Sequence, residues 1–95
     1  MNKIDEERTL RIVLELLKMD KASEAKKLFS EITTSETVQY WMVKGNLEQK
    51  FQNWGGAINA YNHVLDLDAN NTEAENNLHI IQNIINFWNP EMFNP

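Results

Sequence analysis

The sequence predicts an all-α protein of five helices, arranged as antiparallel helix-pair repeats in a single domain of 95 residues. Apolar residues recur at helical spacing in five segments, and short polar stretches that favour turns separate these segments. No segment has the strict alternation of apolar and polar residues that is typical of a half-buried strand. The second half of the chain also echoes the first, which indicates a stacked repeat architecture.

The first helix is predicted by a run of about ten residues, from Leu10 to Met19, that contains no glycine or proline. Residues 20–23 follow as a turn. The second helix carries residues on one face at positions i, i+3, i+4 and i+7, namely Ala25, Leu28, Phe29 and Ile32. Residues 33–35, Thr-Thr-Ser, are expected to end this helix, because their hydroxyl groups compete for backbone hydrogen bonds.

A third helix is predicted from about Glu36 to about Phe51. Asn53 is a suitable N-cap for a fourth helix, which is expected to end near Asp66, before a loop over residues 68–71. Core candidates recur along both helices: Val38, Trp41, Met42, Gly45 and Leu47, then Ala57, Ile58, Tyr61, Val64 and Leu65.

The fifth helix is predicted to begin at a capping box formed by Thr72 and Glu75, whose spacing lets hydroxyl and carboxylate satisfy free backbone N–H groups reciprocally. It is expected to run to about Trp88 and to stop before Pro90, because proline cannot continue a helix. Its apolar residues are Leu78, Ile81, Ile84 and Ile85.

The internal echo has a constant shift of 32 residues. It relates four pairs: Val13 and Gly45, Ala25 and Ala57, Phe29 and Tyr61, and Ile32 and Val64. In both copies an alanine precedes an aromatic residue by four positions, so the two share a helix face. A small residue lets a neighbouring helix approach closely, and the aromatic ring fills the space beside it. Such units cannot bury their apolar faces alone and are expected to stack.

The second copy resembles a tetratricopeptide repeat over residues 41–47 and 53–71. The family's Trp, small Gly, Ala, aromatic and small apolar positions are occupied by Trp41, Gly45, Ala57, Tyr61 and Val64. The ending Leu-Asp-Leu-Asp-Ala-Asn-Asn at residues 65–71 is also typical. The chain departs from the family at Lys44, where leucine is usual, at Glu48, where an aromatic residue is usual, and at Ala69, where proline is usual.

The resemblance covers nearly the whole chain and implies its organisation. A first repeat, matched more weakly, would span about residues 6–37, and the second about residues 38–71. Residues 72–95 would supply a capping helix, similar to the first helix of a third repeat, and a tail. The period of 32 is shorter than the family's usual 34, so one connection is expected to be short, near residues 33–35.

The resemblance implies a non-catalytic adaptor or scaffold that binds another protein or peptide. In such stacks the first helix of each repeat lines a concave groove. The implied groove residues are Glu7, Leu10, Leu14, Leu17, Lys18, Gln39, Met42, Asn46, Gln49, Lys50, Glu73, Asn76, Ile80 and Asn83.

The first helix carries a second apolar stripe, Leu10, Leu14 and Leu17, beside its expected core residues. Those core residues are Ile12, Val13, Leu16 and Met19. A helix that is apolar nearly all round is buried on more than one side. Three alternatives could bury the stripe: a partner peptide, a second copy of the chain, or the chain's own tail with Phe87, Trp88, Met92 and Phe93. A second copy that binds through this helix or through the aromatic tail would make a self-associating structural homodimer, which is the alternative function. A fourth interpretation shifts the register by one position and makes the stripe ordinary core.

The charge is unevenly distributed. All nine Lys and Arg residues precede residue 51, and residues 51–95 carry a net charge of −5. Phosphate binding needs clustered cations, so no nucleic-acid partner is expected. This half would attract a cationic partner, although net charge also keeps small proteins soluble.

The sequence contains no constellation of residues for catalysis, and neither a metal nor a cofactor is expected. It has no cysteine, and its two histidines, His63 and His79, are not in metal-ligand spacing. Gly55-Gly56 lacks the lysine of a phosphate-binding loop. The first residues lack the apolar run of a secretory signal, and no stretch reaches the roughly 18 apolar residues of a membrane span. A cytoplasmic protein without a membrane partner is therefore expected.

Overall fold

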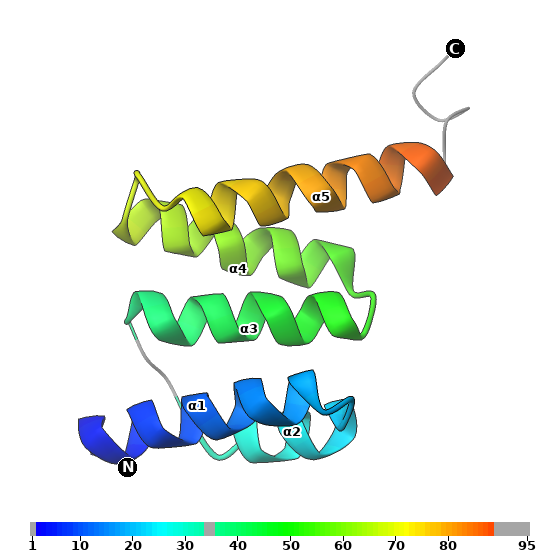
Figure 1. The fold of residues 1–95 in the computed structure, drawn as a ribbon. Coiled ribbons are helices and arrows are strands. Elements are labelled where there is room, and N and C mark those ends of the chain that lie inside the picture. The colour runs from blue at the N-terminus through cyan, green and yellow to red at the C-terminus, as the bar shows by residue number, and fades with distance from the viewer. Residues whose placement is uncertain (1, 34–35, 89–95) are drawn as a thin grey trace.

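The computed structural model describes residues 2–33 and 36–88, apart from the side chain of Trp88, and forms five α-helices (Figure 1). They are α1 (Lys3–Lys18), α2 (Ala22–Phe29), α3 (Val38–Lys50), α4 (Trp54–Leu67) and α5 (Thr72–Trp88). Successive helices run in alternating directions, and α3 lies between the α1–α2 pair and α4 (Figure 1). No strand occurs in these residues, which confirms the predicted all-α fold class. None of the helices described is long and apolar enough to cross a membrane.

Side-chain caps set the starts of four helices, α1, α3, α4 and α5. Asn2 and Thr37 accept hydrogen bonds from the backbone N–H groups of Asp5 (2.9 Å) and Tyr40 (3.1 Å). Asn53 accepts from the N–H group of Gly56 at 3.3 Å, which confirms its predicted capping role. Because Asn2 caps α1, this helix begins well before the apolar run from which it was predicted.

The predicted capping box of α5 is wrong by one residue. Oδ1 of Asn71 accepts from the N–H group of Ala74 at 2.9 Å, and Thr72 is already the first helical residue. Asparagine is at least as good an N-cap as threonine, so Asn71 and Thr72 are both suitable caps. The path of the loop between α4 and α5 then decides which of them takes the cap position.

The turns that follow α1 and α3 have the same backbone geometry. Asp20 (φ 63°) and Gln52 (φ 61°) are both left-handed, and they lie 32 positions apart. In the first turn the N–H group of Lys21 donates to the carbonyl of Leu16 at 2.8 Å. The equivalent bond in the second turn joins Asn53 to Glu48 at 2.9 Å. Both turns are thus Schellman motifs, in which a left-handed residue lets the chain satisfy the last carbonyls of the helix.

The first core cluster joins α1, α2 and α3. It consists of Leu10, Val13, Ala25, Phe29, Ile32, Tyr40, Val43 and Leu47. The rings of Phe29 and Tyr40 stack at 5.0 Å between centroids. Leu14, Leu16 and Leu17 are half-buried against this cluster, so α2 and α3 provide the cover that the leucine stripe requires.

The predicted orientation of α1 is therefore only partly right: Val13 is buried in the first cluster and Leu16 packs against it, as expected. Leu10, expected in the groove, is 1 % exposed in the core, whereas Ile12 (51 %) and Met19 (58 %), expected in the core, face solvent. The stripe is ordinary core, as the fourth interpretation supposed. The physical reason is that α1 has apolar residues on nearly every side, so its neighbours rather than its own pattern select the buried face.

The second core cluster joins α3, α4 and α5. It consists of Met42, Ala57, Tyr61, Val64, Ala74 and Ile81. Trp41 packs against both clusters, so α3 is the shared wall between the α1–α2 pair and the rest of the chain.

Candidate functional site

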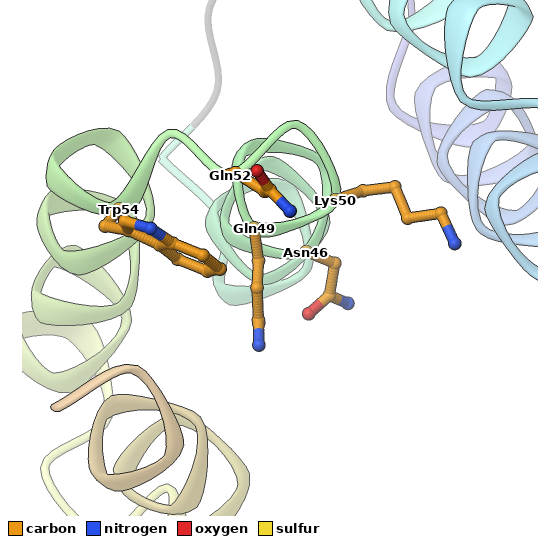
Figure 2. A pocket seen from close by; sticks show the side chains of 5 residues that line it. All are labelled: Asn46, Gln49, Lys50, Gln52 and Trp54. Carbon is orange, nitrogen blue, oxygen red and sulfur yellow. The ribbon is translucent and has the colours of Figure 1, made fainter. Parts of the chain in front are cut away.

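A hollow of about 350 Å³ lies beside the C-terminal half of α3 and its turn into α4 (Figure 2). It is lined by Asn46, Gln49, Lys50, Gln52 and Trp54. Three of these residues, Asn46, Gln49 and Lys50, belong to the groove that the sequence predicts. Asn46 and Gln49 extend from α3 to the same side (Figure 2). The hollow is the place where predicted groove residues come together.

The two amide groups are held by Tyr61 of α4. Its hydroxyl group donates to Oδ1 of Asn46 at 2.6 Å and also lies 3.0 Å from Oε1 of Gln49. Because both amide oxygens face this hydroxyl group, both amide nitrogens are directed away from it. Within residues 2–33 and 36–88 neither nitrogen donates to another protein group. Two positioned N–H donors are thus available on the hollow.

The position of Tyr61 depends on Gly45. Tyr61 is fully buried, and a Cβ atom added to Gly45 would lie only 2.5 Å from its Cε1 atom. Real Cβ atoms do not approach a ring this closely, so only glycine lets the ring lie against the backbone of α3. Two positions that carry the resemblance to a repeat, Gly45 and Tyr61, thus also support the amide pair.

Tyr61 acts as a neutral donor at physiological pH. Burial raises the pKa of its hydroxyl group above the ordinary value, and the carboxylate of Glu73 adds to the rise. Both causes disfavour the phenolate. The single hydroxyl proton, which the oxygens of Asn46 and Gln49 share as acceptors, therefore remains in place well above neutral pH.

Lys50 provides a cation at the edge of the hollow and joins α3 to the first turn. Its Nζ atom lies 2.9 Å from Oδ1 of Asp20. The hydrogen bond from Lys50, and then its charge, hold the pKa of the Asp20 carboxyl group below the ordinary value. Asp20 is exposed, so this pair adds orientation to Lys50 more than it adds stability.

The remaining predicted groove residues differ in their burial. Met42, like Leu10, lies in the core, so its predicted contact with a partner is wrong. Leu14, Leu17 and Gln39 are half-buried, and Lys18 pairs with Glu15 on the exposed side of α1. The predicted groove residues Glu7, Glu73, Asn76, Ile80 and Asn83 are exposed.

The predicted cover of α1 by the tail fails at Phe87, which is 76 % exposed at the end of α5. It cannot cover α1, because α5 packs on α4 and α1 lies on the other side of α3 (Figure 1). The side chain of Trp88, and Met92 and Phe93, lie outside the described residues.

Sequence reasoning missed two residues of the hollow, Gln52 and Trp54. Gln52 is the left-handed residue of the second Schellman turn. It stands 32 positions after Asp20, the left-handed residue of the first turn, so the echo could have indicated that the two turns are equivalent. Trp54 packs against the second cluster while it also lines the hollow. Its position directly after the Asn53 cap places it at the mouth of the α3–α4 turn.

No group of three or more His, Asp or Glu side chains in the described part of the chain could hold a metal ion. His63 stacks on Trp41 with ring centroids 4.1 Å apart.

Comparison of the chain with protein-family models, with curated proteins and with solved structures finds no match in any of the three.

Proposed function

We propose that the chain is a tetratricopeptide-type adaptor that binds an extended peptide segment of another protein at the hollow beside α3. The observation that supports this most directly is the pair of amide groups on Asn46 and Gln49, oriented by the buried hydroxyl group of Tyr61. Donors whose direction is set before binding lose little conformational freedom when a ligand arrives. This arrangement favours recognition of a polypeptide over catalysis.

The peptide backbone supplies the complementary chemistry. Carbonyl oxygens of an extended segment would accept from Nδ2 of Asn46 and Nε2 of Gln49, as backbone carbonyls accept from side-chain amides generally. Lys50, whose side chain is partly exposed, would face an acidic side chain of the partner. Trp54 offers apolar surface at the other side of the hollow. The hollow is small, so we expect weak, reversible binding in the micromolar range.

A homodimer through the leucine stripe of α1 is not proposed, because that stripe is covered by α2 and α3. The non-catalytic interpretation rests on the residue types that line the hollow: two amides, a lysine, a glutamine and a tryptophan. None of these groups is arranged as a nucleophile with a general base.

Selection of random peptides displayed on phage, followed by titration of the selected peptides, tests the proposal. The variant Asn46→Ala/Gln49→Ala should bind the selected peptides about tenfold more weakly, since each lost hydrogen bond contributes about 0.5–1.5 kcal/mol. Asn59→Ala, which removes an exposed amide from α4, is the matched control and should bind normally. Selected peptides that bind the double variant as tightly as the parent would refute the proposed site.

A further inference from the structure

α5 repeats the way in which α3 packs on the helix pair before it. On α3, Tyr40 and Leu47 are buried in the first cluster, against α1 and α2. On α5, Ala74 and Ile81 are buried in the second cluster, against α4. Each α5 residue stands 34 positions after its counterpart on α3. The two helices thus present equivalent faces to the preceding pair.

The equivalence identifies a second face of α5 that no other described helix covers as α4 covers α3. On one side of α3, Trp41 and Gly45 meet His63 and Tyr61 of α4, and Glu48 meets Asn53, the N-cap of α4. The residues 34 positions later, Glu75, His79 and Gln82, are exposed. Of the helices described, α5 packs on α4, and no further helix takes the place beside it that α4 takes beside α3.

Two adjoining hollows mark this place between α4 and α5. One, of about 250 Å³, is lined by Leu65, Glu75, Leu78, His79 and Gln82. The other, of about 270 Å³, is lined by Ile58, Asn62, Leu78, Gln82 and Ile85. Leu78 and Gln82 line both, so the two hollows adjoin, and together they are called the α4–α5 groove. Its apolar residues, Ile58, Leu65, Leu78 and Ile85, are half-buried and pack on the second core cluster.

The surroundings of the α4–α5 groove are anionic. Residues 51–95 contain no Lys or Arg, and Glu75 itself lines the groove. Asp66, exposed at the C-terminal end of α4, follows the groove residue Leu65 directly. Rim charges of one sign favour a partner of the opposite sign and steer its approach. A second copy is disfavoured at a symmetric contact, because two anionic grooves would face each other.

We propose that the α4–α5 groove binds an amphipathic helix of another protein, one that carries two apolar residues one turn apart and a cationic flank. The two apolar residues would enter the two hollows, and the cations would face Glu75 and Asp66. Since His79 stands where α3 has Gly45, the incoming helix cannot approach as closely as Tyr61 approaches α3. Aliphatic side chains therefore suit the groove better than an aromatic ring. This proposal does not depend on the peptide site beside Asn46, because the two surfaces share no residue.

The test uses the full chain and a fluorescein-labelled Leu/Lys peptide of about 18 residues, long enough to span about 27 Å as a helix. Its leucines are placed on one helix face. Two matched peptides accompany it: a scrambled one of the same composition, and one with glutamate in place of lysine. Fluorescence anisotropy measures binding to the parent protein and to two variants. Gln82→Trp fills the groove from an exposed position, and Ser23→Trp, the control, adds the same ring to the exposed surface of α2.

The proposal expects the amphipathic cationic peptide to bind the parent and Ser23→Trp equally, and Gln82→Trp at least about tenfold more weakly. It also expects the scrambled and glutamate peptides to bind the parent at least about tenfold more weakly than the first peptide. The proposal would be overturned if the scrambled peptide bound the parent as tightly as the amphipathic peptide does, or if the amphipathic peptide bound Gln82→Trp as tightly as the parent. In either case the attraction would be general and not centred on the groove.

Two further outcomes would also overturn the proposal. Sedimentation that shows a dimer of the parent but a monomer of Gln82→Trp would assign the groove to a second copy. A gain of more than about tenfold in peptide affinity in Met92→Ala/Phe93→Ala would assign it to the chain's own last residues.

Discussion

The hydroxyl group of Tyr61 on α4 donates to Oδ1 of Asn46 on α3 across 2.6 Å, while the ring of the same residue lies against the backbone of Gly45. One side chain thus belongs both to the core and to the candidate site. Packing between α3 and α4 and the orientation of the amide pair cannot be altered independently. Several measurable consequences depend on this coupling and on the turn geometry beside it.

Gly45→Ala should destabilise the protein by roughly 1–3 kcal/mol, because the new methyl group would meet the Tyr61 ring and force it outward. The alanine's better helix propensity offsets only part of this cost. Urea unfolding followed by circular dichroism measures the change. Gly55→Ala is the control, since no atom lies within 4 Å of its added Cβ, and it should be neutral or stabilising. Equal effects of the two substitutions would contradict the close approach at Gly45.

Tyr61→Phe should make the protein less sensitive to alkaline pH. The pKa of Tyr61 is raised in the fold by burial and by Glu73, so its contribution to stability is complete below the unfolded-state value of 10.0 and is lost as pH rises. Phenylalanine has no proton to lose. Unfolding free energies of both proteins from about pH 8 to about pH 11 test this. Parallel curves would show that Tyr61 does not contribute to the alkaline loss. Tyr40, whose pKa burial and Glu6 also raise, remains in both proteins.

Gln52→Gly should stabilise the protein by roughly 0.5–1 kcal/mol, because it removes the strain of a left-handed glutamine in the Schellman turn. Thermal and urea unfolding measure the effect, with Gln52→Ala as a control that keeps the Cβ atom and so keeps the strain. Asp20→Gly relieves the equivalent residue but removes the partner of Lys50, so its gain should be smaller. A loss of stability in Gln52→Gly would contradict the turn geometry.

Lys50→Gln should raise the pKa of the Asp20 carboxyl group toward its ordinary value of 3.8, because both causes of the lowering come from Lys50. A lowered carboxyl pKa supports the fold above the unfolded-state value, and that support is lost as pH falls through the folded-state value. Titration of the Asp20 side chain by NMR compares the two proteins. An unchanged titration of Asp20 would mean that the ion pair does not persist in solution.

Leu10→Ala should cost roughly 2–5 kcal/mol, because Leu10 is enclosed in the first core cluster. Ile12→Ala and Met19→Ala should each cost less than about 1 kcal/mol, since both side chains are more than half exposed. Urea unfolding of the three variants decides which face of α1 is buried. The opposite ranking would restore the orientation that the sequence alone predicts.

Local signals in the sequence predict the helices well. Helical spacing, turn residues and the Asn53 cap place the helices, with shifts of a few residues at their ends. The largest shift, at the start of α1, arises because polar residues near Asn2 carry no apolar periodicity. The prediction of the hollow is partial: Asn46, Gln49 and Lys50 are included, whereas Gln52 and Trp54 belong to a turn whose path the apolar pattern does not describe.

The sequence by itself determined the five helices and the 32-residue echo, because helical periodicity and residue size act over a few neighbouring positions. Only the tertiary structure decided that Leu10 faces inward, that Asn71 caps α5, and that the Tyr61 hydroxyl group orients the two amides. Each of these depends on which surface another helix covers. A helix that is apolar on several sides can bury more than one face at similar free energy, and two adjacent cap-forming residues can start a helix equally well. Contacts with distant segments then decide which face is buried and which residue is the cap.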